Sequence, residues 1–206
     1  MLQDIKEVLF SEEAINKRVK ELASRISEDY KGKELLVVGV LKGSVIFAAE
    51  LIKNITIPCQ IDFMAVSSYG DSSETTGVVR ILKDLDSEIS GKHIIIVEDI
   101  VDSGITLNYL SNYLKSRNAS SVEIVSLLTK PSRRKVDIDC KYVGFETPDE
   151  FLVGYGLDYA EKYRNLPFVG ILKREVYEKK VIKKQNKKTM RKGGLEWRNI
   201  QVLLYG

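Results

Sequence analysis

The chain has 206 residues, of which 44% are hydrophobic and 30% charged, a composition typical of a soluble globular protein. No apolar run is long enough to span a membrane, and residues 1–10 lack a basic start followed by an apolar stretch. We therefore expect a cytoplasmic protein with no membrane partner. Cys59 and Cys140 fit a reducing compartment, and His93 as the only histidine argues against a zinc site or a Ser-His-Asp triad.

The net charge of +3 is unevenly distributed along the chain. Residues 178–206 hold nine Lys and Arg and two Glu, a net charge of +7, which leaves −4 for residues 1–177. We expect one domain over 1–177 and a basic C-terminal extension of unknown role over 178–206. Such a run could bind nucleic acid or an acidic partner, but a solvated or partly helical extension is the interpretation we favour, so nucleic acid is not an expected partner.

Helix and strand patterns alternate in the first half of the chain. The expected elements are an amphipathic helix over 11–28, a buried strand over 34–40, a helix over 44–54, and strands over 60–68 and 78–83. The polar, turn-rich segment 69–77 interrupts this pattern and cannot bury itself. Segments of this kind inside a compact domain are typical of mobile active-site loops.

The second half continues the same alternation. We expect an apolar strand that begins at residue 93, a helix over 105–117, and strands over 121–129, 142–146, 151–155 and 168–172. Alternating strands and helices predict an α/β fold with a mostly parallel sheet and helices on both faces. No internal repeat is visible in the sequence.

The stretch 93–107, HIIIVEDIVDSGITL, is the most informative part of the chain. Its apolar run ends in Glu98 and Asp99, a turn follows at 102–104, and Thr106 opens the next helix. Ligands of open α/β sheets bind outside the carboxyl ends of such strands. Two carboxylates suit Mg²⁺, and the N–H groups of the turn suit a phosphate. The alternative is a solvated turn in which Asp102 or Ser103 only caps the helix.

A strand-end acid pair followed by Lys-Pro also occurs in phosphoacceptor receiver domains. Those domains need a third, phosphorylated Asp at the end of an intervening strand, and their lysine lies much further along the chain. Only one helix and one strand separate the acid pair from Lys130 here. The receiver interpretation therefore fails.

Residues 98–106 resemble the phosphoribosyl-pyrophosphate (PRPP) binding loop of the type I phosphoribosyltransferase family. Further motifs resemble its hypoxanthine-guanine branch: Leu41-Lys42-Gly43, Ser68-Tyr69, Lys130-Pro131 and the run 143–158, VGFETPDEFLVGYGLD. These motifs follow one another in family order over residues 5–177. The resemblance implies the type I phosphoribosyltransferase fold, a mostly parallel twisted sheet flanked by helices, with a small hood built from the N-terminal segment and about 150–177.

The resemblance also implies roles for residues of the acidic loop. Glu98 and Asp99 would contact the ribose hydroxyls and Mg²⁺, and Asp158 would hold a second Mg²⁺. Asp102 would act as general base toward N7 of the purine. The 5′-phosphate would be held by the turn and the helix start, namely Asp102, Ser103, Gly104, Ile105 and Thr106.

Other implied contacts lie outside that loop. Pyrophosphate would be bound by Arg164 and by Lys42 and Gly43, where the family backbone often has a cis peptide. The base would be met by Lys130 at its 6-oxo group, by the ring of Phe151 and by the backbone of Leu152, while Ser68 and Tyr69 would open the lid. Taken singly, each has an ordinary alternative: a loop lysine at 130, a core residue at 151, a turn residue at 158 and a surface ion pair at 164.

The implied reaction transfers the 5-phosphoribosyl group of PRPP to hypoxanthine, and also to guanine. The products would be IMP or GMP and pyrophosphate, with Mg²⁺ as cofactor and a homodimer or homotetramer as the assembly. A lysine facing the 6-position favours an oxo over an amino group, because an amino group would present a second donor. The alternative is a regulator with the same fold that binds nucleotide and RNA, helped by the basic extension.

Overall fold

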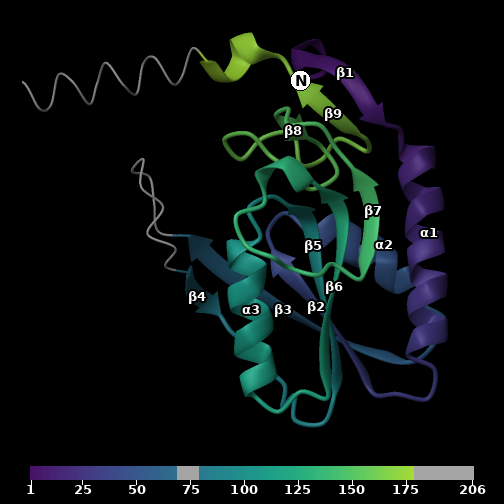
Figure 1. Cartoon of the computed structure of the whole chain (residues 1–206). Helices are drawn as coiled ribbons and strands as arrows, with labels where there is room; N and C mark the ends of the chain where they lie inside the picture. Colours follow the sequence, from purple (N-terminus) through teal and green to yellow (C-terminus); the bar gives the residue numbers. More distant parts are fainter. Residues whose placement is uncertain (69–78, 179–206) are drawn as a thin grey trace, which may run out of the picture.

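The computed structural model describes residues 1–68 and 79–178 (Figure 1). The predicted lid segment, including Tyr69, and nearly all of the basic extension lie outside these residues. The elements in chain order are β1 Ile5–Phe10, α1 Glu12–Asp29, β2 Leu35–Leu41, α2 Val45–Asn54, β3 Cys59–Ser68, β4 Val79–Lys83, β5 His93–Val101, α3 Ile105–Ser116, β6 Ser121–Thr129, β7 Tyr142–Glu146, β8 Leu152–Val153 and β9 Val169–Leu172, with short 3-10 turns at Leu2–Asp4 and Pro131–Arg133.

The larger sheet has six strands in the order β4-β3-β2-β5-β6-β7. Five of them are parallel, and only the edge strand β4 runs antiparallel to its neighbour β3. Helices α1 and α2 cover one face of this sheet and α3 covers the other (Figure 1). The α/β architecture expected from the sequence is confirmed.

Burial on both faces explains the unbroken apolar runs of the central strands. Along β2, Leu35 and Val37 belong to the core under α1 and α2, whereas Leu36 and Val38 belong to the core under α3. The same alternation separates Ile95 and Val97 from Ile94 and Ile96 on β5. Successive side chains of a strand point to opposite faces, so a strand covered on both sides requires apolar residues at every position.

A second, three-stranded sheet forms the hood, with the order β1-β9-β8 and antiparallel pairing throughout. Figure 1 shows it above the carboxyl ends of the parallel strands. The sequence analysis missed β1 and predicted a strand over 151–155, of which only Leu152–Val153 is extended and paired. Both are short strands at the edges of the small sheet, without a strong periodic signal. No helix among the described residues is long and apolar enough to cross a membrane.

Replacing Ile95 by Ala should destabilise the protein by about 2–4 kcal/mol, because its fully buried side chain fills the core between the sheet and α1 and α2. Urea unfolding followed by circular dichroism would measure this change. Ile61 is the matched control, since it lies on β3 of the same sheet with 49% of its surface exposed. A loss in Ile95→Ala no larger than in Ile61→Ala would contradict the packing described here.

Candidate active site

The carboxyl ends of the parallel strands open into two adjoining cavities beneath the hood. The larger, of about 450 Å³, is lined by residues that include Asp102, Lys130, Phe151, Leu152 and Asp158. The smaller, of about 260 Å³, is lined by Leu41 and the predicted residues Glu98, Asp102, Ser103, Gly104 and Thr106. Ile100 and Asp102 line both cavities. The structure thus brings most of the predicted site residues to one edge of the sheet.

Glu98 and Asp99 lie near the carboxyl end of the central strand β5, after its buried apolar run, and form a pair of desolvated carboxylates. Burial raises the pKa of Glu98 well above its usual value, and the charge and hydrogen bonding of Asp99 add to the rise. Burial also raises the pKa of Asp99 to about 6, against the lowering effect of the Ile100 N–H, which donates to Oδ1 at 2.7 Å, and of the charge of Arg164. A cation bound beside these two acids would stabilise their charged forms and so lower both pKa values.

The turn after the acid pair leads directly into α3. Gly104 is the N-cap of that helix with φ +80°, and it makes no side-chain capping bond. The Ser103 hydroxyl accepts only a long bond of 3.4 Å from the Ile105 N–H. Neither Asp102 nor Ser103 therefore caps the helix in the usual way, and Gly104 and Thr106 at the helix start line the smaller cavity.

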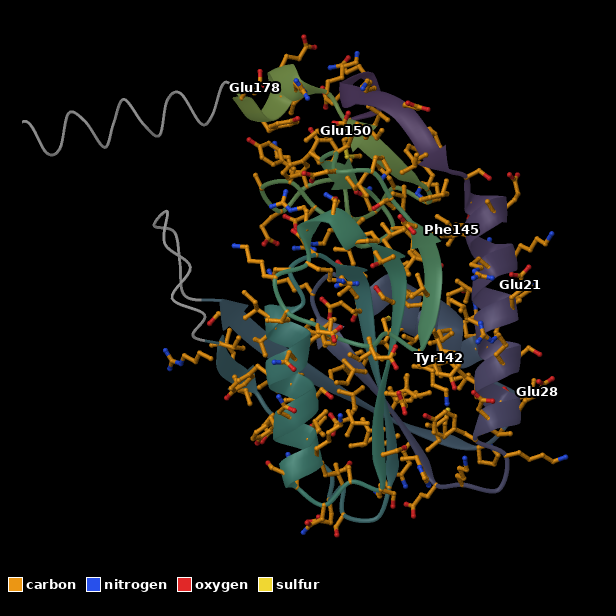
Figure 2. All side chains as sticks on the ribbon, in the orientation of Figure 1. Glu21, Glu28, Tyr142, Phe145, Glu150 and Glu178 are labelled. Atoms are coloured by element: carbon orange, nitrogen blue, oxygen red, sulfur yellow. The ribbon has the colours of Figure 1, made fainter. Side chains whose placement is uncertain are left out.

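Lys130 stands at the end of β6 with its side chain largely buried in the wall of the larger cavity. Its Nζ donates to the carbonyl of Glu150 at 2.6 Å, and burial lowers its pKa. Figure 2 shows Glu150 at the level of the hood, above the ends of β6 and β7. A buried lysine with spare donors is suited to meet an oxo group of a ligand in this cavity.

Phe151 lies in the same cavity, exposed rather than in the core, and belongs to an aromatic cluster that the sequence analysis did not anticipate. Its ring stacks on Tyr177 at a centroid distance of 5.1 Å and meets Tyr159 edge-on at 5.4 Å. Leu152 is buried and pairs with Ile171 of β9, which holds the backbone next to Phe151. Tyr177 gave no local signal, because only the fold of the hood brings it to Phe151.

Arg133 contacts Asp102, another feature that the sequence analysis missed. Its Nε lies 2.8 Å from Oδ1 of Asp102, but the N–H does not point at that oxygen, so the ion pair lacks an aligned hydrogen bond. Its Nη1 also lies 3.1 Å from Oδ1 of Asp149. Arg133 follows Lys130 by three residues in the turn Pro131–Arg133, and this proximity was the available signal.

The predicted residues Lys42 and Gly43 form the turn between β2 and α2, and Arg164 and Asp158 of the hood lie close to this turn. The peptide joining Leu41 and Lys42 is cis. A Cβ on Gly43 would lie 1.7 Å from Oδ2 of Asp99, and one on Gly156 would lie 2.0 Å from the Gly43 carbonyl. Glycine is needed at both positions because the backbones and the Asp99 carboxylate approach too closely for any side chain.

Arg164 and Asp158 complete this group from the hood. The Nη2 of Arg164 lies 2.7 Å from Oδ1 of Asp158, and its Nη1 donates to the Gly156 carbonyl at 2.8 Å. The Arg164 charge also acts on Asp99. The predicted pyrophosphate and metal residues therefore come together, although Lys42, Gly43 and Arg164 do not line the two cavities themselves.

Three side-chain polar atoms in the described parts of the chain are buried without a hydrogen-bond partner. They are Oε2 of Glu98, Oδ1 of Asp102 and Nε of Arg164, and all three belong to residues predicted as site residues from the sequence. Unsatisfied buried polar groups are rare in folded proteins because each costs about 1–3 kcal/mol. Two of these atoms are carboxylate oxygens, which a cation or a hydrogen-bond donor would satisfy, and the third is an N–H, which an anionic oxygen would satisfy.

Comparison with known proteins agrees with this geometry. The profile of the phosphoribosyl transferase domain matches residues 7–160. The hypoxanthine-guanine phosphoribosyltransferase of Bacillus subtilis (strain 168) is 54% identical over 178 residues, covering 86% of this chain and 99% of the relative. That of Staphylococcus aureus (strain Mu50 / ATCC 700699) is 55% identical over 177 residues, with 86% and 99% coverage.

Solved structures give the same result. A crystal structure of a hypoxanthine phosphoribosyltransferase from Staphylococcus aureus superposes with a TM-score of 0.84 at 55% identity, covering 86% of this chain and 96% of the other. A structure of an HPRT in which an invariant aspartic acid is replaced by asparagine has a TM-score of 0.83 at 39% identity, covering 87% and 99%.

The fold and the site define a phosphoribosyltransferase, and the chain belongs to that family. Within the family, the relatives named above place it in the hypoxanthine-guanine branch. The resemblance seen in the sequence motifs, and the type I phosphoribosyltransferase fold that it implied, are confirmed.

The raised pKa of Asp99 predicts a pH-dependent effect of Asp99→Asn in metal-free buffer. A carboxyl whose folded pKa lies near 6 destabilises the folded state as pH rises above the unfolded value near 3.8. The variant should therefore be more stable than wild type by about 1–3 kcal/mol at pH 7. This gain should fall below about 1 kcal/mol at pH 4, where Asp99 is protonated in the folded protein and partly protonated in the unfolded chain.

Urea unfolding at both pH values, with EDTA present, would test this prediction. The same exchange at Asp137, an exposed residue, is the control and should change stability little at either pH. An Asp99→Asn protein that is less stable than wild type at pH 7 would show that the carboxylate is satisfied by its protein neighbours.

Proposed function

We propose that this protein is a purine salvage enzyme that transfers the 5-phosphoribosyl group of PRPP to hypoxanthine and guanine, giving IMP or GMP and pyrophosphate. The observation that carries the proposal is the set of three buried polar atoms without a hydrogen-bond partner, Oε2 of Glu98, Oδ1 of Asp102 and Nε of Arg164. Membership of the hypoxanthine-guanine branch supports the same activity. Within this proposal, residues 1–177 form the catalytic domain and 178–206 are an extension outside the chemistry.

The two cavities support a division of the substrates between them. In our proposal the 5′-phosphate occupies the smaller cavity, held by the N–H groups and hydroxyls of 102–106 at the start of α3. The purine occupies the larger cavity against Phe151, with Lys130 donating to its 6-oxo group and the Leu152 backbone at its edge. Asp102 lines both cavities, so its carboxylate can accept the N7 proton while the ribose is joined to the base.

We assign stabilisation of the leaving group's charge to the residues around the turn between β2 and α2 and to Arg164 of the hood. As the bond between the ribose C1′ and pyrophosphate breaks, the departing diphosphate meets Lys42, the backbone at Gly43, and Arg164. The oxocarbenium-like ribose would react with water, and exclusion of solvent is the role that we assign to the segment opened by Ser68 and Tyr69.

The donor set fits Mg²⁺, which commonly binds one or two carboxylates together with substrate phosphates and water. Glu98 and Asp99 would hold one ion, where the unpaired Oε2 of Glu98 and the raised pKa values favour a cation. Asp158 would hold a second. Bound Mg²⁺ would neutralise the diphosphate charge. No group of three or more His, Cys, Asp or Glu in the described ranges forms a metal cage by itself, in keeping with ions that arrive with the substrate.

The resemblance to the family also supports the proposals of a homodimer or homotetramer and of a cytoplasmic location. Cys59 and Cys140 are both free thiols, as expected in a reducing compartment. The alternative of a regulator that binds nucleotide and RNA is not favoured, because Lys130, Phe151 and Asp158 gather in one cavity suited to a base.

Purified protein should convert hypoxanthine and guanine with PRPP and Mg²⁺ and leave adenine almost untouched, because Lys130 would face a second donor on a 6-amino base. Absorbance assays with hypoxanthine, guanine, xanthine and adenine would measure this. A chain ending at Tyr177 should retain most of the turnover. No turnover, together with RNA binding that weakens steeply with salt, would instead support the regulator.

Replacing Asp102 by Asn should lower kcat about 10²–10⁴-fold, because the amide cannot accept the N7 proton. The affinity for PRPP, measured by calorimetry, should change little, since the phosphate-binding N–H groups remain. The same exchange at the exposed Asp139 is the control. Near-normal turnover in Asp102→Asn would remove this residue from the role of base.

A further inference from the structure

Glu161 bridges the two cations that are proposed to hold pyrophosphate. Its Oε2 lies 3.1 Å from the Nζ of Lys42, and its Oε1 lies 3.6 Å from Nη2 of Arg164. Lys42 precedes α2, whereas Arg164 and Glu161 belong to the loop between β8 and β9 of the hood. One carboxylate therefore joins the two sides of the site, with one oxygen toward each cation.

The backbone around Glu161 is built to present this carboxylate. Ala160 and Glu161 have φ of +53° and +62°, in the left-handed region that costs energy for residues with a side chain. The Glu161 N–H donates to Oδ2 of Asp158 at 2.8 Å, and Tyr159 and Lys162 exchange backbone hydrogen bonds of 3.1 and 3.2 Å. A tight turn thus fixes the position of a side chain that is itself 67% exposed.

Stability does not account for this arrangement. Lys42 is 70% exposed, and ion pairs between such exposed side chains contribute only about 0–1 kcal/mol. Arg164 is held without Glu161, since Asp158 and the Gly156 carbonyl already bind its two terminal nitrogens. Lys42, by contrast, has Glu161 as its ion-pair partner, and its cation is the same one that a diphosphate would need.

We infer that Glu161 is an internal counter-anion of the pyrophosphate subsite, which pairs with Lys42 and Arg164 when the subsite is empty and competes with pyrophosphate for them. This inference rests on the proposed function and adds a residue that acts on product release. A carboxylate and a diphosphate oxygen make the same charge-assisted contacts with lysine and arginine. The negative charge of Glu161 also repels the more highly charged diphosphate at short range.

As a consequence, the subsite binds pyrophosphate less tightly than Lys42 and Arg164 would bind it without Glu161. When the product leaves, Glu161 replaces it on Lys42 and adds a second carboxylate to Arg164, which Asp158 already holds. Because Glu161 is held by its own loop and does not line the base cavity, it should not affect binding of the purine. The effect is confined to ligands that carry the diphosphate.

The test is Glu161→Gln, which keeps the shape of the side chain and removes its charge. Titration calorimetry with pyrophosphate in the presence of Mg²⁺ should show binding about three- to tenfold tighter than wild type. Inhibition of turnover by pyrophosphate should strengthen by the same factor and the KM for PRPP should fall. The KM for hypoxanthine should stay unchanged.

Glu21→Gln is the matched control, because Glu21 forms an exposed pair with Arg18 at 2.8 Å on α1, away from the site (Figure 2). It should leave pyrophosphate affinity unaltered. Glu161→Asp, which keeps the charge but shortens the reach toward Lys42, should tighten pyrophosphate less than Glu161→Gln. It also provides a second measurement if the glutamine variant folds poorly.

Pyrophosphate affinity that is unchanged or weaker in both Glu161 variants would overturn the inference and give Glu161 a supporting role in binding instead. That result is distinct from failure of the proposed function. In the latter case wild-type protein itself would neither turn over PRPP and hypoxanthine nor bind pyrophosphate.

Discussion

Two carboxylates at the end of a buried strand are the constraint on which the site depends. Glu98 and Asp99 follow an apolar run on β5 that is covered on both faces, and burial of the two carboxyl groups raises the pKa of both. A pair of this kind is costly unless cations surround it. The structure places Arg164 near Asp99 and keeps Gly43 free of a side chain that would displace the Asp99 carboxylate.

The hood supplies the site residues that do not come from the large sheet. Strand β1, at the N-terminus, pairs with β9, and β9 pairs with β8, so residues far apart in the chain form one small sheet above the site. Phe151, Asp158 and Arg164 all come from this part of the chain. The positions of the proposed base and diphosphate subsites therefore depend on contacts made by the first ten residues, although none of those residues is proposed to touch a ligand.

Several charged side chains around the cavities form ion pairs with one another. Arg133 pairs with Asp102 and Asp149, Arg164 with Asp158, and Lys42 with Glu161. Several of these pairs are partly exposed and add little to stability. In the proposed function, each pair would hold its charged groups while no ligand is bound, and a phosphate or a metal ion would take the place of one partner.

The sequence predicted much of the fold because local patterns and tertiary burial agree in the large sheet. The strands over 34–40, 60–68 and 121–129 and the helices over 11–28 and 105–117 lie within one residue of their observed bounds, since buried strands need continuous apolar runs and amphipathic helices a single apolar stripe. Strand β1 was missed because it is itself an edge strand of the small sheet, and its residues Ile5–Phe10 are exposed or only partly buried.

The sequence by itself determined the chemistry of the acidic loop, because Glu98 to Thr106 are contiguous and their spacing places carboxylates, a turn and a helix start at one strand end. Its motifs also identified the family. Only the tertiary structure decided which distant residues meet: Arg133 beside Asp102 of that loop, the ring of Tyr177 against Phe151, and Glu161 between Lys42 and Arg164. These contacts join separate segments of the chain, two of the three by way of the hood, and nothing in the local sequence specifies such long-range distances.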